Sequence, residues 1–452
     1  MQPSYDDLLT IIKKQQAIIE ELRSEIILLK EELSRYKNRK NSNNSHLPPS
    51  KDENRPLKNQ SLREKSDKKP GGQPGHEGKT LEFSDQADKI VKHSPAFCNC
   101  CGNDLDQVSE VLLGRRQVVD IPPIALERTE HQVYSKKCSC GYVTEGNFPS
   151  YIKSSVQYGP NVEAIVAYMH TRQYLPFNRM KEFFSDVLGL PVSEGGIHNI
   201  LQRFTKKALP FYLQIKERIK DAVFLGTDET GAKVNGKKHW FWTWQNEELT
   251  FIVHSDSRGF KTIENTFEDG LPFTILGHDR WASHFQCNAK HHQLCTAHLL
   301  RDLNYIQQLY QSRWAIELKQ LLCQAIDLKK QPDYNYYLQE NIPRKILEQN
   351  LKELLNRPLP ETDKKAKTLQ KKLLKHQDFI LYFLHHPDVP PDNNGSERAI
   401  RNIKVKQKIS GHFKSIDGAN GFAIIRSVID TTLKSGQNIL NALSLIARWG
   451  TE

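Results

Sequence analysis

The sequence predicts a multi-domain α+β protein, and three observations support this class. Apolar residues recur with a heptad spacing over residues 1–37, two closely spaced cysteine pairs lie between residues 98 and 140, and short runs of β-branched and aromatic residues begin after residue 221. A chain of 452 residues has room for about three domains. Its hydrophobic content of 38% is enough to form hydrophobic cores, whereas its mean hydropathy of -0.62 implies that part of the chain is extended or solvated.

The charge of the chain points to a partner of opposite sign. The net charge of +11 and the isoelectric point of about 9.1 favour a polyanion, although a generally basic soluble protein has the same charge. No run of eighteen apolar residues occurs, so we expect no membrane span and no membrane partner. The N-terminus lacks the basic and apolar regions of a secretory signal, which predicts a cytoplasmic protein.

Residues 1–37 have the pattern of a coiled coil, or leucine zipper. Two seam positions alternate at spacings of three and four and are filled by Tyr5, Ile12, Ile19, Ile26 and Leu33, and by Leu8, Gln15, Leu22, Leu29 and Tyr36. Isoleucine at the first position and leucine at the second favour a parallel homodimer, and the polar Gln15 would fix its register. The alternative is one amphipathic helix packed on its own domain.

Residues 38–82 are expected to form a flexible basic linker. Lys and Arg outnumber acidic residues here, and few apolar side chains are available to offset the entropy of ordering. Such a segment could follow DNA phosphates, or serve as a plain tether.

Residues 83–155 are predicted to form a small β-rich module that binds zinc. Cys98 and Cys101 form a CxxC pair, and Cys138 and Cys140 form a tighter CxC pair, with the strand-like segment QVVDI between them. In a cytosolic chain this spacing indicates metal binding rather than disulfides, and four thiolates can enclose a structural Zn²⁺ tetrahedrally. Cys100 could substitute for a neighbour, and free thiols are the alternative.

Residues 156–220 are expected to be helical. Two helical segments flank a turn that contains Ser193, with Gly189 as the stop of the first helix. This outline is typical of a helix-turn-helix DNA-binding region, but packed helical domains share it.

Residues 221–298 predict the first part of an α/β domain. Three strand-like runs are followed by a helical stretch and a fourth run, and Asn235-Gly236 lies between the first two as a hairpin turn. This is the opening order of an RNase H-like fold of the retroviral-integrase type. Residues 299–386 would form a large helical insertion, and residues 387–452 would complete the domain with further helices.

Three carboxylates are candidates for a catalytic metal site. Asp228 and Asp279 each end an apolar run, and Glu397 opens a basic helical stretch. If the two strands are neighbours, both aspartates emerge at one edge of the sheet. Oxygen ligands of this kind suit two Mg²⁺ or Mn²⁺ ions, which can activate a nucleophile and stabilise a leaving oxygen at one phosphorus. The plain alternative is that these acids only cap helices and form surface ion pairs.

The neighbours of these acids have a functional and a structural interpretation. Glu229 should face away from Asp228 on a strand. Arg398 and Arg401 lie within about one turn of Glu397, and with Lys404 and Lys408 they could grip DNA phosphates or form a solvated basic face. His278 could contact DNA or pack, and Trp240, Trp242 and Trp244 share one strand face, where core packing is favoured.

Four strings in order resemble bacterial insertion-sequence transposases of the sixty-six family, which are of the DDE type. These are TDETGAKVNGKKHWFW, HDRWASHF, QLCTAHLLRDL and NNGSERAIRNIKVKQKISG. The resemblance covers nearly the whole chain, including the zipper and the cysteine module. It implies that Asp228, Asp279 and Glu397 are the catalytic metal ligands, and that Cys295 and His298 form a CxxH element. These two residues lie one helical turn apart and could share a metal, but two ligands make an incomplete site, so a packing or orienting role is favoured. Arg280 departs from the small or aromatic residue that many relatives have after the second aspartate.

The resemblance also implies an activity and partners. A nucleoid-associated DNA transposase of this type would bind the terminal inverted repeats of its insertion sequence in double-stranded DNA. It would cleave the 3′ ends and transfer them into target DNA, as a homodimer or higher oligomer and with accessory proteins of the same element as further partners. Two rivals are a zinc-containing DNA-binding regulator with an inactive remnant catalytic domain, and an RNase H-like structure-specific DNA nuclease.

Overall fold

The computed structural model describes residues 5–37, 40–41, 44, 81–122, 124–338 and 340–449. The chain divides into two compact units, one formed by Met1–Arg55 with Arg128–Glu452 and the other by Pro56–Glu127. Most of the predicted linker over 38–82 lies outside the described residues. In the part of the chain that is described, no helix is both long and apolar enough to cross a membrane.

The cysteine-containing region has less β-structure than the sequence predicts. In the described residues of the second unit, the pairing is limited to an isolated bridge between Phe97 and Asp104, and the expected strand at 117–121 is absent. Val118 and Ile121 are largely exposed there, so no packed face stabilises a strand. A short hairpin of β1 (Ser135–Lys137) and β2 (Val143–Glu145) lies in the first unit.

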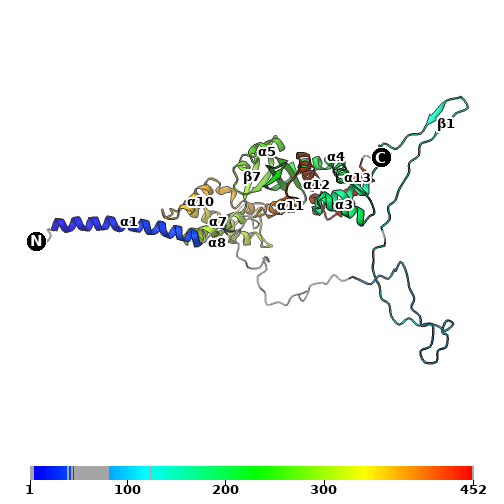
Figure 1. The fold of residues 1–452 in the computed structure, drawn as a ribbon. Helices are drawn as coiled ribbons and strands as arrows, with labels where there is room; N and C mark the ends of the chain where they lie inside the picture. Colours follow the sequence, from blue (N-terminus) through cyan, green and yellow to red (C-terminus); the bar gives the residue numbers. More distant parts are fainter. Residues whose placement is uncertain are drawn as a thin grey trace. The chain divides into compact units, whose positions relative to one another are not determined.

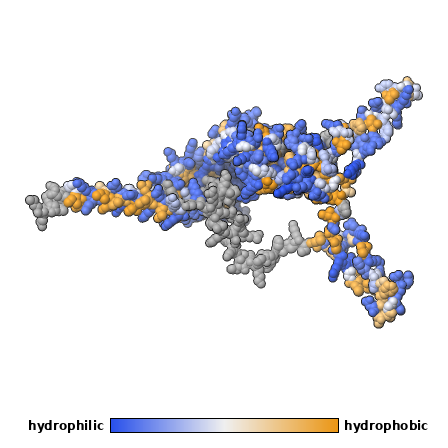
Figure 2. All heavy atoms as spheres, in the orientation of Figure 1, coloured by the Kyte–Doolittle hydropathy of each residue, from blue (hydrophilic) through white to orange (hydrophobic). Residues whose placement is uncertain are grey.

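The predicted N-terminal helix is present as α1 (Tyr5–Lys37). The apolar side chains of its seam are exposed; Ile12, Ile19 and Ile26 each keep about half of their surface open. They recur along the helix as orange atoms in Figure 2. The C-terminal end contacts α7, where Ser34 Oγ donates to the Leu309 carbonyl at 2.9 Å. The side chain of Leu8 is outside the described set.

The helical region over 156–220 contains α2 (Pro160–Ala167), a π-helical turn η2 (Tyr168–Arg172), α3 (Phe177–Asp186) and α4 (Glu194–Lys220). Gly189 follows α3 with a φ of 60°, and Ser193 Oγ caps α4 by accepting from the Gly196 N–H at 3.0 Å. Both helices bury apolar faces, including Phe184 and Phe204, in the main core. The helix-turn-helix outline is therefore a packed element, and its contact with DNA stays a prediction.

The centre of the first unit is a five-stranded mixed sheet with the order β5-β4-β3-β6-β7. The strands are β3 (Phe224–Val234), β4 (Lys237–Gln245), β5 (Thr250–Ser255), β6 (Leu271–His278) and β7 (Ala289–Leu294). The first three are antiparallel, and the predicted hairpin turns at Asn235-Gly236, where φ is 48° and 75°. β6 adds parallel to β3, and β7, which the sequence analysis did not anticipate, adds parallel to β6.

Helices cover the two faces of this sheet (Figure 1). On one face, α11 (Asn394–Ser410) and α12 (Ile416–Lys434) pack on Phe241 and Ile252. On the other, α5 (Phe260–Thr266) and α4 pack around Trp242 and Trp244, which are fully buried. The preference for core packing is therefore confirmed for these two tryptophans. α13 (Ile439–Arg448) packs on α2 and α4.

The predicted helical insertion is present and has its own core. It contains α7 (Thr296–Tyr310), α8 (Arg313–Lys329), α9 (Ile342–Asn356), α10 (Lys364–Lys375) and two 3₁₀ turns, η3 (Gln377–Phe379) and η4 (Tyr382–Leu384). Trp314 is buried in this core and donates to the Leu354 carbonyl at 2.9 Å. The core continues into the sheet through Phe224, Ile275 and Leu294, so the insertion is fixed to the domain that carries the candidate site.

Candidate active site

The sheet places the two predicted aspartates side by side. Parallel pairing sets Gly226 of β3 opposite Gly277 of β6, and Asp228 and Asp279 each lie two residues further on. Residues two apart point to the same face of a strand. The two aspartates therefore lie at one edge of the sheet, as predicted for neighbouring strands.

Helix α11 brings Glu397 to the same edge. Its first turn lies against β3 at Gly226, where an added Cβ would come within 2.7 Å of Ser396 Oγ. The Asn393 amide donates to the Thr227 carbonyl at 2.6 Å, and Ser396 Oγ donates to Asn393 Oδ1 at 2.6 Å. These contacts join the N-terminus of α11 to β3 one residue before Asp228.

The negative charges of the other acids act on Asp228. The pKa of Asp228 is raised well above its usual range, first by burial and then by the negative charges of Glu229, Asp279 and Glu397. Like charges at short range disfavour the ionised form of each other, and a bound cation reverses this effect. The oxygen donors and their mutual repulsion therefore fit a hard divalent cation.

Glu397 is held by basic neighbours. Its Oε1 lies 3.3 Å from an Arg301 nitrogen and 3.7 Å from His298 Nε2, and its Oε2 lies 3.7 Å from an Arg401 nitrogen. Among the described residues, no group of three or more His, Cys, Asp or Glu side chains is placed to hold a metal ion. A metal site formed by the three carboxylates is therefore not preformed in this part of the chain.

Asp279 is oriented by its own turn. Its Oδ1 accepts from the Trp281 backbone N–H at 2.8 Å and lies 3.8 Å from His284 Nε2. Arg280, the departure from the family pattern, forms an ion pair with Asp302 on α7. The arginine therefore ties the turn after β6 to the insertion.

Glu229 lies on the opposite face from Asp228, as expected for adjacent strand residues. It is buried, with Oε1 2.6 Å from an Arg258 nitrogen and Oε2 3.1 Å from His284 Nε2. Burial pushes its pKa up, but His284 and Arg258 outweigh this effect and leave the pKa of Glu229 below its usual value. Since His284 also approaches Asp279, Glu229 supports the site from behind rather than lining it.

The CxxH element packs behind the acids. Cys295 is buried, and its Sγ accepts from the Asn393 N–H at 3.2 Å. Burial raises the pKa of this thiol to about 11, so it is a neutral hydrogen-bond partner for the start of α11. Together with the position of His298 beside Glu397, this contact favours an orienting role for the pair.

The predicted DNA-binding residues of α11 differ in their exposure to solvent. Arg398, Arg401 and Lys408 are exposed, whereas Lys404 is half-buried and its amine donates to the Gly231 carbonyl. Lys404 therefore joins α11 to β3 and is not presented to solvent with the other three. His278, for which DNA contact was open, is buried and lies 3.0 Å from His292 Nδ1.

The four predicted zinc ligands lie on two similar tight turns, one in each compact unit. In the first turn the Gly102 N–H donates to the Cys98 carbonyl, and in the second the Gly141 N–H donates to the Cys138 carbonyl, both at 2.9 Å. The two glycines have φ values of 75° and 90°.

Backbone N–H groups stabilise the thiolate form at both turns. Those of Cys101 and Cys100 lower the pKa of the Cys98 thiol, and that of Cys140 lowers the pKa of Cys138. Thiolates held in this way suit zinc ligation at each turn. Cys100 and Cys140 are themselves exposed.

Three residues beside the site were not predicted from the sequence, namely Arg258, Trp281 and His284. Trp281 and His284 lie within the string that contains Asp279, which is a usable signal. Arg258 carries no local signal, because its partner Glu229 is 29 residues away.

The chain matches known protein families. A family model described as the Transposase IS66 family matches residues 155–421, more than half of the chain. A model for the zinc-finger binding domain of transposase IS66 matches residues 95–141, and a family of unknown function, DUF6444, matches residues 2–82. No curated protein sequence matches the chain.

Proposed function

The chain belongs to the IS66 family of transposases, and we propose that it cleaves and joins DNA at the ends of its own insertion sequence. It would bind the terminal inverted repeats, cut each 3′ end and transfer that end into target DNA, at the nucleoid. This proposal is supported by the parallel register that brings Asp228 and Asp279 to one edge of the sheet, and by the packing of the first turn of α11, which carries Glu397, against β3. The strand order β5-β4-β3-β6-β7 supports an RNase H-like fold of the retroviral-integrase type for the domain.

The three acids would hold two Mg²⁺ or Mn²⁺ ions. When bound, such ions supply an activated water or 3′-hydroxyl and stabilise the departing 3′-oxygen. The protein itself orients these ligands, since the Trp281 N–H fixes Asp279 and the contact of α11 with Gly226 fixes the backbone of Glu397. Arg301 and His298, now beside Glu397, would be released toward the DNA phosphate when that carboxylate turns to the metal.

The two chemical steps would be direct displacements at phosphorus. In the first, water attacks and the bond to the 3′-oxygen breaks, which leaves a 3′-hydroxyl. In the second, this hydroxyl attacks a target phosphate, forms the new phosphodiester and expels a target 3′-oxygen. The exposed Arg398, Arg401 and Lys408 would bind the flanking phosphates.

Terminal repeats that bracket the gene provide the test of this function. The full-length protein with a labelled repeat and Mg²⁺ should nick at the 3′ end, and pre-cleaved ends should give strand-transfer products. Repeat-specific binding without nicking would instead identify a DNA-binding regulator with an inactive domain. Cutting without joining would identify a structure-specific nuclease.

The zinc module would contribute recognition of the ends, and its cysteines can be tested directly. Replacing Cys98 and Cys101 together by Ser should release zinc and weaken repeat binding, because two thiolate ligands are lost. The readouts are metal content and the dissociation constant for the repeat. Cys323→Ser, which changes an exposed cysteine of the insertion, is the matched control and should alter neither. Unchanged zinc content in the double variant would place the ligands elsewhere.

Helix α1 would dimerise with a second copy, so that two DNA ends are held together. Replacing Ile12 and Ile19 by Asp places charges in the exposed seam and should convert a dimer to a monomer, as measured by light scattering. Ala17→Asp adds one such charge outside the seam and should leave the mass unchanged. A double variant with the mass of the wild type would rule out the zipper as the dimer contact.

A further inference from the structure

Four side chains form an alternating stack of cations and aromatic rings beside the candidate active site. Lys238 Nζ lies 4.7 Å from the centre of the Trp240 ring. The Arg258 guanidinium lies 4.9 Å from that ring and 3.8 Å from the centre of the Trp281 ring. We refer to Lys238, Trp240, Arg258 and Trp281 as the stack. They come from β4, from the loop between β5 and α5, and from the turn after β6.

The stack is fixed in place rather than loosely packed. The Arg258 guanidinium is held by the buried Glu229, with Nε at 2.7 Å and a terminal nitrogen at 2.6 Å from Oε1. The Trp281 indole N–H donates to the Arg258 carbonyl at 3.3 Å. The rings and the guanidinium are therefore ordered before any partner binds, which lowers the entropic penalty of binding.

The outer member of the stack adjoins the catalytic carboxylates. The Trp281 backbone N–H donates to Asp279 Oδ1, and 36% of the residue remains exposed. In the described part of the chain, Arg258 provides the only cation–π contact to Trp281, and no aromatic ring pairs with it. A nucleotide whose phosphate lies at Asp279 would bring its base within reach of this ring.

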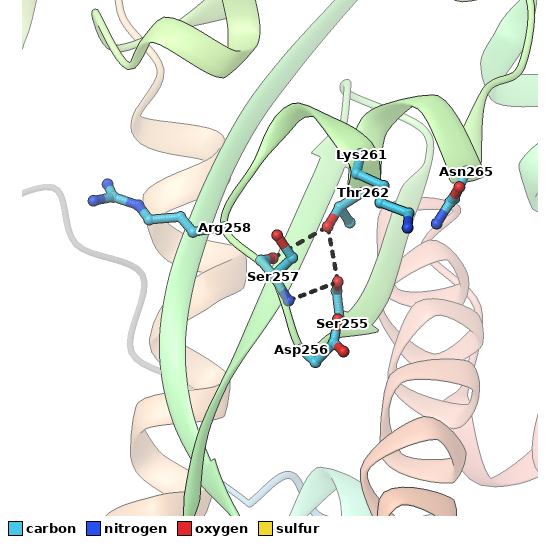
Figure 3. Close-up of a pocket in the computed structure, with 7 residues that line it drawn as sticks. All are labelled: Ser255, Asp256, Ser257, Arg258, Lys261, Thr262 and Asn265. Carbon is cyan, nitrogen blue, oxygen red and sulfur yellow. Dashed lines mark hydrogen bonds between the residues drawn. The ribbon is translucent and has the colours of Figure 1, made fainter.

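A polar pocket of about 500 Å³ lies next to the stack, at the corner between β5 and α5 (Figure 3). Arg258 extends away from the other residues that line it, whereas Lys261, Thr262 and Asn265 lie together. Ser257 and Lys261 offer a hydroxyl and a cation there, and Asp256 adds a carboxylate to the lining. Lys261 suits contact with a DNA phosphate on the strand that leaves the site.

We propose that the stack receives an unpaired base of the DNA end, which stacks on Trp281 next to the scissile phosphate. Aromatic faces with adjacent arginine bind single-stranded bases without regard to sequence. A base taken out of the duplex would leave its phosphate accessible to the carboxylates. This inference rests on the proposed cleavage of DNA ends. It assigns a DNA base as the partner of the stack, which the chemistry of the three carboxylates does not itself require.

The test uses full-length protein and a terminal-repeat duplex with 2-aminopurine at the terminal nucleotides. Wild-type protein should quench or shift the fluorescence of one of these bases, and Trp281→Ala should abolish that change. Loss of a single base stack predicts a fall in cleavage of roughly 5- to 100-fold. Cleavage should recover on ends that carry a mismatch at the flipped position, and Trp281→Phe should retain most of the activity.

Trp449→Ala is the matched control, since this tryptophan is 59% exposed on the last helix and packs on Phe211, away from the stack. It should leave both readouts unchanged. If Trp281→Ala lowers the melting temperature, Trp281→Leu, which keeps an apolar side chain without a ring, gives the same comparison. Equal fluorescence and equal cleavage for wild type and these variants would overturn the stacking role. Failure of the wild type to cut any end would instead refute the proposed function.

Discussion

Asp228→Asn is expected to abolish DNA cleavage, with Asp279→Asn and Glu397→Gln giving the same result. Each change removes a charged oxygen ligand from a site whose ions would stabilise several kcal/mol of transition-state charge, so the loss should reach roughly a thousandfold or more. Binding of the terminal repeat without metal should persist, because other surfaces carry it. The measurements are single-turnover cleavage and repeat affinity.

The stability of the Asp228 variant separates loss of chemistry from loss of fold. Because folding raises the pKa of Asp228, its ionised form at neutral pH opposes folding. An uncharged Asn lacks this repulsion, so the melting temperature should stay equal or rise. Asp269→Asn, at an exposed position of the same domain, should change neither cleavage nor stability. Full cleavage by any of the three acid variants would remove that residue from the catalytic set.

Gly226→Ala is expected to inactivate the protein without touching a carboxylate. The new Cβ would lie 2.7 Å from Ser396 Oγ, and the start of α11 must move away from β3 to accommodate it. Overpacking of this kind destabilises a fold by about 1–3 kcal/mol. Displacement of Glu397 should lower cleavage by roughly a hundredfold, since small misplacements of catalytic groups have effects of that size.

Gly231→Ala is the matched control on the same strand. An added Cβ there meets its nearest neighbour, in the Lys238 side chain, at 3.5 Å, which is an ordinary contact. It should preserve the melting temperature and cleavage. Equal activity of the two alanine variants would show that the contact between α11 and β3 does not position Glu397.

Local patterns predicted much of the fold. The Asn235-Gly236 turn and the alternating aromatic residues predicted the hairpin of β3 and β4, and the heptads predicted α1. Periodicity failed for the segment over 117–121, where apolar residues lack a packed face. Periodicity also did not predict β7, because its sequence AKHHQL is rich in histidine and lysine and lacks an apolar alternation. Burial against the insertion, not local propensity, makes that segment a strand.

The candidate acids could be named from sequence because two of them end apolar runs and all three lie in recognisable strings. The surroundings could not be named in the same way. Lys404 looked like its basic neighbours, yet the close approach of α11 to β3 at Gly231 turns its amine inward. The contacts of Glu229 with Arg258 and His284 join residues 29 and 55 positions apart, and no local pattern encodes such pairs.

By itself, the sequence determined the family of this protein and a long N-terminal helix, and it singled out two cysteine pairs and three candidate acids. These features depend on residue type and short spacing, which are properties of the chain before it folds. Only the tertiary structure decided that parallel pairing aligns Asp228 with Asp279, that a glycine lets α11 deliver Glu397, and that Arg258 lies against Trp281. Those outcomes depend on which distant surfaces pack together. The free energies of burial and close contact arise only when the whole chain has folded.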